Sequence, residues 1–116
     1  ISAKFKGSSG NKDKIEQTQF NLIEKKKISQ PSQIKTCGST FKNISVDKKA
    51  WMLIKEAGCA DFKVGDAMIS QKHCNFFVNK GNAKSADIEN LIKKVKKAVH
   101  AKTGVNLELE IKIIGE

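Results

Sequence analysis

The stretch from Ser85 to Gly104 has the most regular hydrophobic pattern in the chain, and it constrains the fold more than any other feature. Ser85 is placed to cap a helix, and Gly104 is placed to end it. Between them, apolar residues recur at the three- and four-residue spacing that lines one face of a helix: Ile88, Leu91, Ile92, Val95, Ala98 and Val99. This stripe predicts a core-facing helix rather than a binding groove.

Three further segments are predicted to supply complementary apolar faces. Residues 50–57 have helical spacing and are followed by Gly58, a residue suited to a left-handed cap. Residues 76–78 are a short apolar run before a turn, which indicates a buried strand. Residues 107–113 alternate between apolar and charged side chains, the two-residue period of a strand, so Glu110 is expected to point away from the core.

This mixture predicts an α+β fold: a small domain with a few-stranded, mainly antiparallel sheet packed against two helices. Residues 1–7 resemble a strand from a larger unit, and 13–27 a connecting helix that ends near Gln30-Pro31-Ser32. We therefore expect a fragment with a boundary there. Residues 1–30 would end an upstream domain, and 31–116 would form a C-terminal domain.

The net charge of +10 raises the alternative of a small lysine-rich module that binds nucleic acid or an anionic surface. All 22 basic residues are lysine, whereas arginine is the usual residue for reading guanine and stacking on bases. The aromatic residues also lie in apolar patterns rather than among the lysines. No nucleic-acid partner is therefore predicted, although a phosphorylated small molecule would need only a few cations.

The cysteines and the hydropathy indicate the redox compartment and bear on whether the chain has a metal site or a membrane segment. Cys37, Cys59 and Cys74 are odd in number and unpaired in spacing, which fits a reducing compartment. His73 lies beside Cys74, but the spacing of metal sites is missing, so no metal is predicted. The longest apolar run, residues 50–54, is far shorter than the roughly 20 residues that span a bilayer, so no membrane segment is predicted.

The segment Gly38-Ser39-Thr40-Phe41-Lys42-Asn43 is the best indication of chemistry. It combines a hydroxyl, a cation and an amide, and Glu110 adds a distant carboxylate. If the fold brings them together, these groups could bind a phosphorylated substrate and protonate it. Taken singly, Ser39 is equally well a turn serine and Glu110 a solvated strand residue.

Five ordered blocks resemble the C-terminal portion of the UDP-N-acetylenolpyruvoylglucosamine reductase family, also called UDP-N-acetylmuramate dehydrogenases. They are Gln30-Pro31 with Gly38 to Asn43, Leu53-Ile54 with Glu56-Ala57-Gly58, Gly65 with Ala67, Ser70 and Lys72-His73, then Phe76, Asn79, Gly81 and Ala83, and finally Gly104, Leu107, Glu110, Ile114 and Gly115. Ile44 and Asp66 depart from the family pattern, which has proline and glycine there.

The resemblance implies a cytoplasmic enzyme of peptidoglycan precursor synthesis, and hence of cell wall biogenesis, cell shape and cell division. NADPH would reduce FAD, and the flavin would reduce the enolpyruvyl ether of a UDP-sugar. It implies that Ser39 donates a proton, that Glu110 stabilises an enol-like intermediate, and that Asn43 and His73 lie toward the substrate diphosphate. His73 could equally be a structural histidine. No dinucleotide-binding fingerprint or arginine occurs here, so FAD and NADPH are expected to bind mainly to upstream domains, and the oligomeric state stays open.

Overall fold

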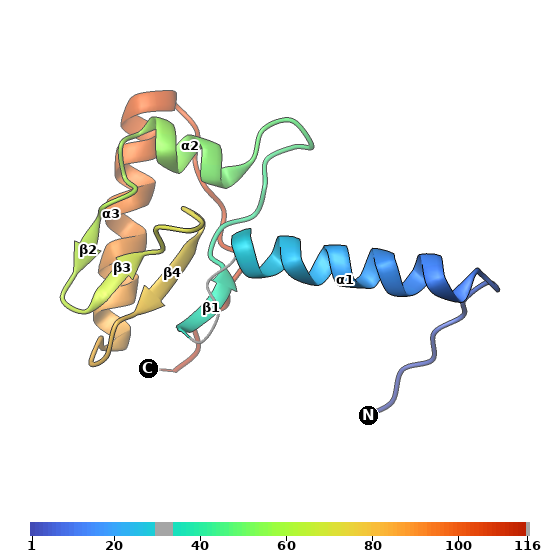
Figure 1. Ribbon diagram of the computed structural model, residues 1–116. Helices are drawn as coiled ribbons and strands as arrows, with labels where there is room; N and C mark the ends of the chain where they lie inside the picture. The colour runs from blue at the N-terminus through green and yellow to red at the C-terminus, as the bar shows by residue number, and fades with distance from the viewer. Residues whose placement is uncertain (30–33, 116) are drawn as a thin grey trace.

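Figure 1 shows helices packed on a small β-sheet, with one further long helix that projects away from them. This computed structural model describes residues 1–29 and 34–115. The elements, in chain order, are α1 (Lys12–Ser29), β1 (Lys35–Ser39), α2 (Ala50–Glu56), β2 (Lys63–Val64), β3 (Ala67–Ile69), β4 (Phe76–Asn79) and α3 (Ser85–Thr103). The predicted fold class is confirmed, as are the helix at residues 50–57 and the strand at 76–78.

The four strands form one antiparallel sheet in the order β1-β4-β3-β2. The central strand β4 places Phe76, Phe77 and Val78 at 7%, 4% and 2% exposure, which explains why it is almost wholly apolar. The pairing of β1 with β4 shifts between Thr36 and Ser39. Gly38 lies in this irregularity with a φ of +83°, a conformation that other residues rarely adopt.

Helix α3 packs across β2 and β3, and α2 packs against α3. The predicted stripe is buried, because Leu91, Val95 and Val99 are all 0% exposed. Gly104 ends α3 in the left-handed conformation, as predicted. The predicted cap at Ser85 is wrong. Lys84 occupies the cap position instead, and the Asp87 carboxylate accepts a hydrogen bond from the Lys84 backbone N–H at 2.9 Å.

The strand expected at residues 107–113 is also absent. Within the described residues this segment makes only an isolated antiparallel bridge, between Phe41 and Leu109. The alternation of burial persists as far as Ile111, but Ile113 is 51% and Ile114 90% exposed. A strand needs a partner of matching length, and the chain bends away at residues 44–47 toward α2, so the pairing stops after one bridge.

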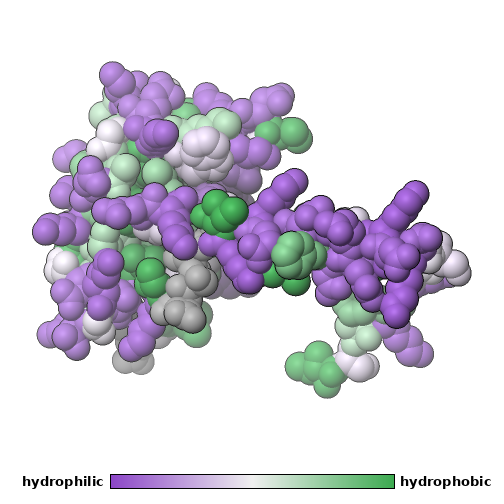
Figure 2. Space-filling model, viewed as in Figure 1, coloured by the Kyte–Doolittle hydropathy of each residue, from purple (hydrophilic) through white to green (hydrophobic). Residues whose placement is uncertain are grey.

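The N-terminal segment, residues 1–29, does not take part in the core that the sheet, α2 and α3 form. Residues 1–11 form no strand, so the strand expected at 1–7 is wrong; a strand requires a hydrogen-bonded neighbour. Helix α1 follows as predicted, but it buries no residue and exposes Phe20 and Leu22 by about 60%. Figure 2 shows hydrophobic patches on an otherwise hydrophilic projection. The boundary predicted at Gln30-Pro31-Ser32 lies outside the described residues.

Candidate functional site

The end of β1 and the C-terminal segment meet at the residues that the sequence singles out. Ser39 is the last residue of β1, and the carbonyl of the next residue, Thr40, accepts a hydrogen bond from the Glu110 backbone N–H at 2.9 Å. A second bond, from Lys42 N–H to the Glu108 carbonyl, measures 2.9 Å. The structure therefore brings the backbones of the predicted serine and glutamate side by side. Both residues are exposed.

An ion pair lies next to this junction. The Lys42 ammonium donates to the Glu108 carboxylate, and the two side chains remain 50% and 73% exposed. Their hydrogen bond, and then their opposite charges, raise the pKa of Lys42 and lower the pKa of Glu108. Glu110 adds a smaller contribution to the raised pKa of Lys42, so this cation is also close to the predicted catalytic carboxylate.

Asn43 connects the serine-bearing segment to α2. Its Oδ1 accepts a hydrogen bond from the Ala50 backbone N–H at 3.1 Å, which satisfies one of the free donors at the start of the helix. No partner of the Asn43 NH₂ group lies among the described residues, so this group is free to donate to a ligand. Asn43 thus has a structural role that the sequence analysis did not foresee, beside the predicted one.

Asn75 fixes the turn after Ser39, and sequence reasoning missed it. It is 3% exposed, its Oδ1 accepts from Phe41 N–H at 3.0 Å, and its Nδ2 donates to the Phe41 carbonyl at 2.8 Å. Its own carbonyl accepts from Thr40 N–H at 2.8 Å. One buried amide therefore satisfies both backbone groups of Phe41. An asparagine directly before an apolar run was the available signal.

His73 lies in the loop just before β4, the strand that pairs with β1. The register pairs Ser39 with Phe76, whose N–H donates to the His73 carbonyl at 3.0 Å. The His73 ring lies 4.7 Å from the Phe76 ring and 6.5 Å from the Trp51 ring, centroid to centroid. Partial burial lowers the pKa of His73. Its Nδ1 accepts from Asn75 N–H at 3.2 Å, so the proton of the neutral ring is on Nε2.

The hollow beside His73 has a volume of about 490 Å³. Trp51 lines it together with two lysines, Lys55 and Lys72. An aromatic wall with two cations and a neutral imidazole suits a partly apolar anion.

The described residues offer little to a resident metal or a flavin. They contain no group of three or more His, Cys, Asp or Glu side chains that could hold a metal ion. Ser39 and Glu110 are both exposed, and neither lines the hollow beside His73. No helix within the described ranges is both long and apolar enough to cross a membrane.

These observations define a class: a small α+β domain that presents a hydroxyl, an amide and a carboxylate on one exposed edge. Residues 30–114 match the family model "UDP-N-acetylenolpyruvoylglucosamine reductase, C-terminal domain". The chain belongs to this family.

Individual relatives with the same family name match nearly the whole of this chain. The UDP-N-acetylenolpyruvoylglucosamine reductase of Pelagibacter ubique is 53% identical over 116 residues, covering 98% of this chain and 38% of the relative. The same-named protein of Novosphingobium aromaticivorans is 44% identical over 115 residues, covering 99% and 38%. The crystal structure of UDP-N-acetylenolpyruvylglucosamine reductase from Thermus caldophilus superposes with a TM-score of 0.75 at 34% identity, covering 90% of this chain and 36% of that one. The chain thus spans well under half the length of these relatives.

Proposed function

We propose that this chain is the C-terminal, substrate-binding part of an FAD- and NADPH-dependent reductase. The enzyme would convert UDP-N-acetylglucosamine enolpyruvate to UDP-N-acetylmuramate in the cytoplasm, during peptidoglycan precursor synthesis. The hydrogen bond from Glu110 N–H to the Thr40 carbonyl carries this proposal, because it brings Glu110 next to Ser39, the residue before Thr40, in a chain of this family. The alternative of a nucleic-acid or anionic-surface binding module has only the net charge in its favour.

Ser39 is the proposed proton donor. An unperturbed hydroxyl is a very weak acid, so it protonates only a strongly basic, carbanion-like carbon held at hydrogen-bond distance. The exposed end of β1 leaves room for a substrate above it. The bound flavin supplies hydride; the role of this chain is to place the proton. Glu110, fixed beside Thr40, stabilises the enol-like intermediate through preorganised contact.

Asn43 and His73 are the proposed contacts to the diphosphate. The free NH₂ group of Asn43 and the Nε2–H of neutral His73 are both donors, and donors are what phosphate oxygens require. Lys55 and Lys72, in the hollow beside His73, add positive charge. The substrate would then extend from this hollow to Ser39 past the start of β4, where Phe76 pairs with Ser39.

We place FAD and NADPH mainly in parts of the full-length protein outside this chain. The division is the expected one, with residues 1–30 belonging to the upstream domain and its connecting helix, and 31–116 to the substrate-binding domain. In support, α1 exposes apolar side chains that an upstream domain could cover, including Ile15 at 54% and Phe20 at 61%.

The test is Ser39→Ala in the full-length enzyme. Reduction of the flavin by NADPH should be nearly unchanged, whereas its reoxidation by the enolpyruvyl substrate should slow by about 10²- to 10⁴-fold, the usual cost of losing a positioned acid. Stopped-flow flavin absorbance separates the two half-reactions. Ser45→Ala, in a loop where that hydroxyl only accepts from Lys48 N–H, is the matched control. An unchanged reoxidation rate in Ser39→Ala would remove this residue from the mechanism.

A further inference from the structure

The segment that carries Ser39 departs from the regular pattern of the sheet. The pairing of β1 with β4 shifts between Thr36 and Ser39, and Gly38 lies within that irregularity with a φ of +83°. In a regular antiparallel pair, evenly repeated backbone hydrogen bonds fix each residue of the strand. An irregularity disrupts these bonds locally, so the position of Ser39 depends on other contacts.

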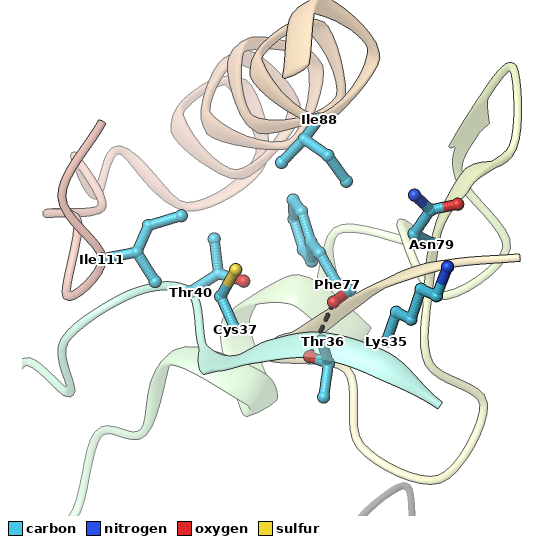
Figure 3. A pocket seen from close by; sticks show the side chains of 8 residues that line it. All are labelled: Lys35, Thr36, Cys37, Thr40, Phe77, Asn79, Ile88 and Ile111. Atoms are coloured by element: carbon cyan, nitrogen blue, oxygen red, sulfur yellow. Dashed lines mark hydrogen bonds between the residues drawn. The ribbon is translucent and has the colours of Figure 1, made fainter. Parts of the chain in front are cut away.

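Thr36 supplies such a contact on the N-terminal side of Ser39. Its Oγ1 donates to the Phe77 carbonyl of β4 at 2.7 Å, the bond that Figure 3 shows as a dashed line. The same oxygen accepts a hydrogen bond from Gly38 N–H at 3.2 Å. One hydroxyl therefore joins β1 to β4 and also holds the residue directly before Ser39.

Asn75 supplies the contact on the C-terminal side. Its carbonyl accepts from Thr40 N–H, and its side chain bonds both backbone groups of Phe41, at distances between 2.8 and 3.0 Å. Its own N–H donates to His73 Nδ1 at 3.2 Å. Asn75 is thus joined to the two residues that follow Ser39 and to the ring that is the proposed diphosphate contact.

We propose that Thr36 and Asn75 are positioning residues for the proton transfer, because together they hold Ser39 in a fixed position beside β4. The inference rests on the proposed function, in which Ser39 is the proton donor. A displacement of about 1 Å in an active site can slow a reaction by about 10²-fold. Loss of either contact should therefore reduce the rate of proton transfer more than it weakens substrate binding.

Thr36→Val tests the first contact with little change of shape. It removes the hydroxyl but keeps the branched side chain, whereas Thr36→Ser keeps the hydroxyl and should retain most of the activity. In the full-length enzyme, we expect Thr36→Val to slow reoxidation of the flavin by the enolpyruvyl substrate about tenfold to a hundredfold. Flavin reduction by NADPH and the KM for the UDP-sugar should stay close to those of the unmodified enzyme.

Asn75→Asp tests the second contact through its pH dependence. The new carboxylate can accept from Phe41 N–H but cannot donate to the Phe41 carbonyl, whereas its protonated form can do both. Burial raises the pKa of such a carboxyl group. Reoxidation should therefore be slow near about pH 8.5 and approach the rate of the unmodified enzyme toward about pH 5.5. Asn75→Ala, which has neither group, should be slow throughout this range.

Leu91→Ala is the matched control for a loss of stability alone. Leu91 is fully buried in α3, which packs across β2 and β3. Its truncation leaves a cavity in the core, but it removes no hydrogen bond around Ser39. Stopped-flow rates are expressed per bound flavin, so unfolded protein does not contribute, and the control should reoxidise at the unmodified rate.

Three outcomes would contradict the inference in different ways. Thr36→Val or Asn75→Ala reoxidised as fast as Leu91→Ala would overturn the positioning role of that residue. A rate of Asn75→Asp that does not change with pH, relative to the unmodified enzyme, would also overturn the role of Asn75. Failure of the enolpyruvyl substrate to reoxidise the unmodified enzyme would overturn the proposed function, and this inference with it.

Discussion

At the scale of single residues, we expect Asn75 to contribute most to the stability of the site. Asn75→Ala leaves the buried N–H and C=O of Phe41 without partners, and each such group costs about 1–3 kcal/mol. We expect the free energy of unfolding to fall by roughly 2–6 kcal/mol, the sum for the two groups. Urea denaturation of this chain measures the loss. Asn82→Ala, at an exposed turn, is the control, and a loss no larger than that control's would contradict the role.

The ion pair between Lys42 and Glu108 makes a pH-dependent prediction. The Glu108 pKa is lowered from its ordinary 4.5, so its contribution to stability is complete above that pH and is lost as the pH falls through the lowered pKa. The Lys42 pKa is raised from 10.5, so its contribution is complete below that pH and is lost as the pH rises through the raised value. Carbon-detected NMR titration should place Glu108 below its ordinary pKa, and Lys42→Met should return it there. A Glu108 midpoint that is the same in both proteins would rule out the pair.

At the scale of elements, the sequence predicted those whose pattern is local. Three local patterns each predicted an element and its buried face. They are the apolar stripe of α3, the apolar spacing of α2 followed by Gly58, and the apolar run of β4. Residues 107–113 show the limit of this reasoning, because alternation reports a buried face but not a hydrogen-bonded neighbour. That neighbour is the short segment around Phe41, whose course is set by Asn75 and by the turn toward α2.

Asn43 links an element to the site, and its two roles can be separated by substitution. Asn43→Ala removes the acceptor for Ala50 N–H and should destabilise the chain by about 1 kcal/mol, as loss of a helix cap does. Asn43→Asp retains an acceptor at the start of α2 and should keep this stability, but it lacks the NH₂ donor and adds a charge that repels a diphosphate. Urea denaturation together with the KM for the UDP-sugar distinguishes the two effects. Full stability of Asn43→Ala would show that the cap is unimportant.

At the scale of the whole molecule, the site depends on contacts that no local pattern contains. The sequence identified Ser39 and Glu110 through family resemblance, but their proximity comes from two backbone bonds between segments about 70 residues apart. Asn75 escaped notice because its significance arises only from its burial and from its two side-chain hydrogen bonds to the Phe41 backbone. The projecting α1, which buries nothing, shows the converse: its helical pattern is clear, yet the described chain gives it no core to join.

This chain alone is not expected to bind the flavin cofactor. Ser39 and Glu110 lie on an exposed edge, and FAD is expected to bind mainly to upstream domains, so the purified 116-residue chain should be colourless and inactive. Added FAD should keep its fluorescence, and no protein-bound absorption band near about 450 nm should appear, the region where an oxidised flavin absorbs. The full-length enzyme is the positive control and should quench the fluorescence at one flavin per chain. Stoichiometric quenching by the 116-residue chain would mean that the flavin site lies within these residues, and the division between cofactor-binding and substrate-binding domains would have to be redrawn.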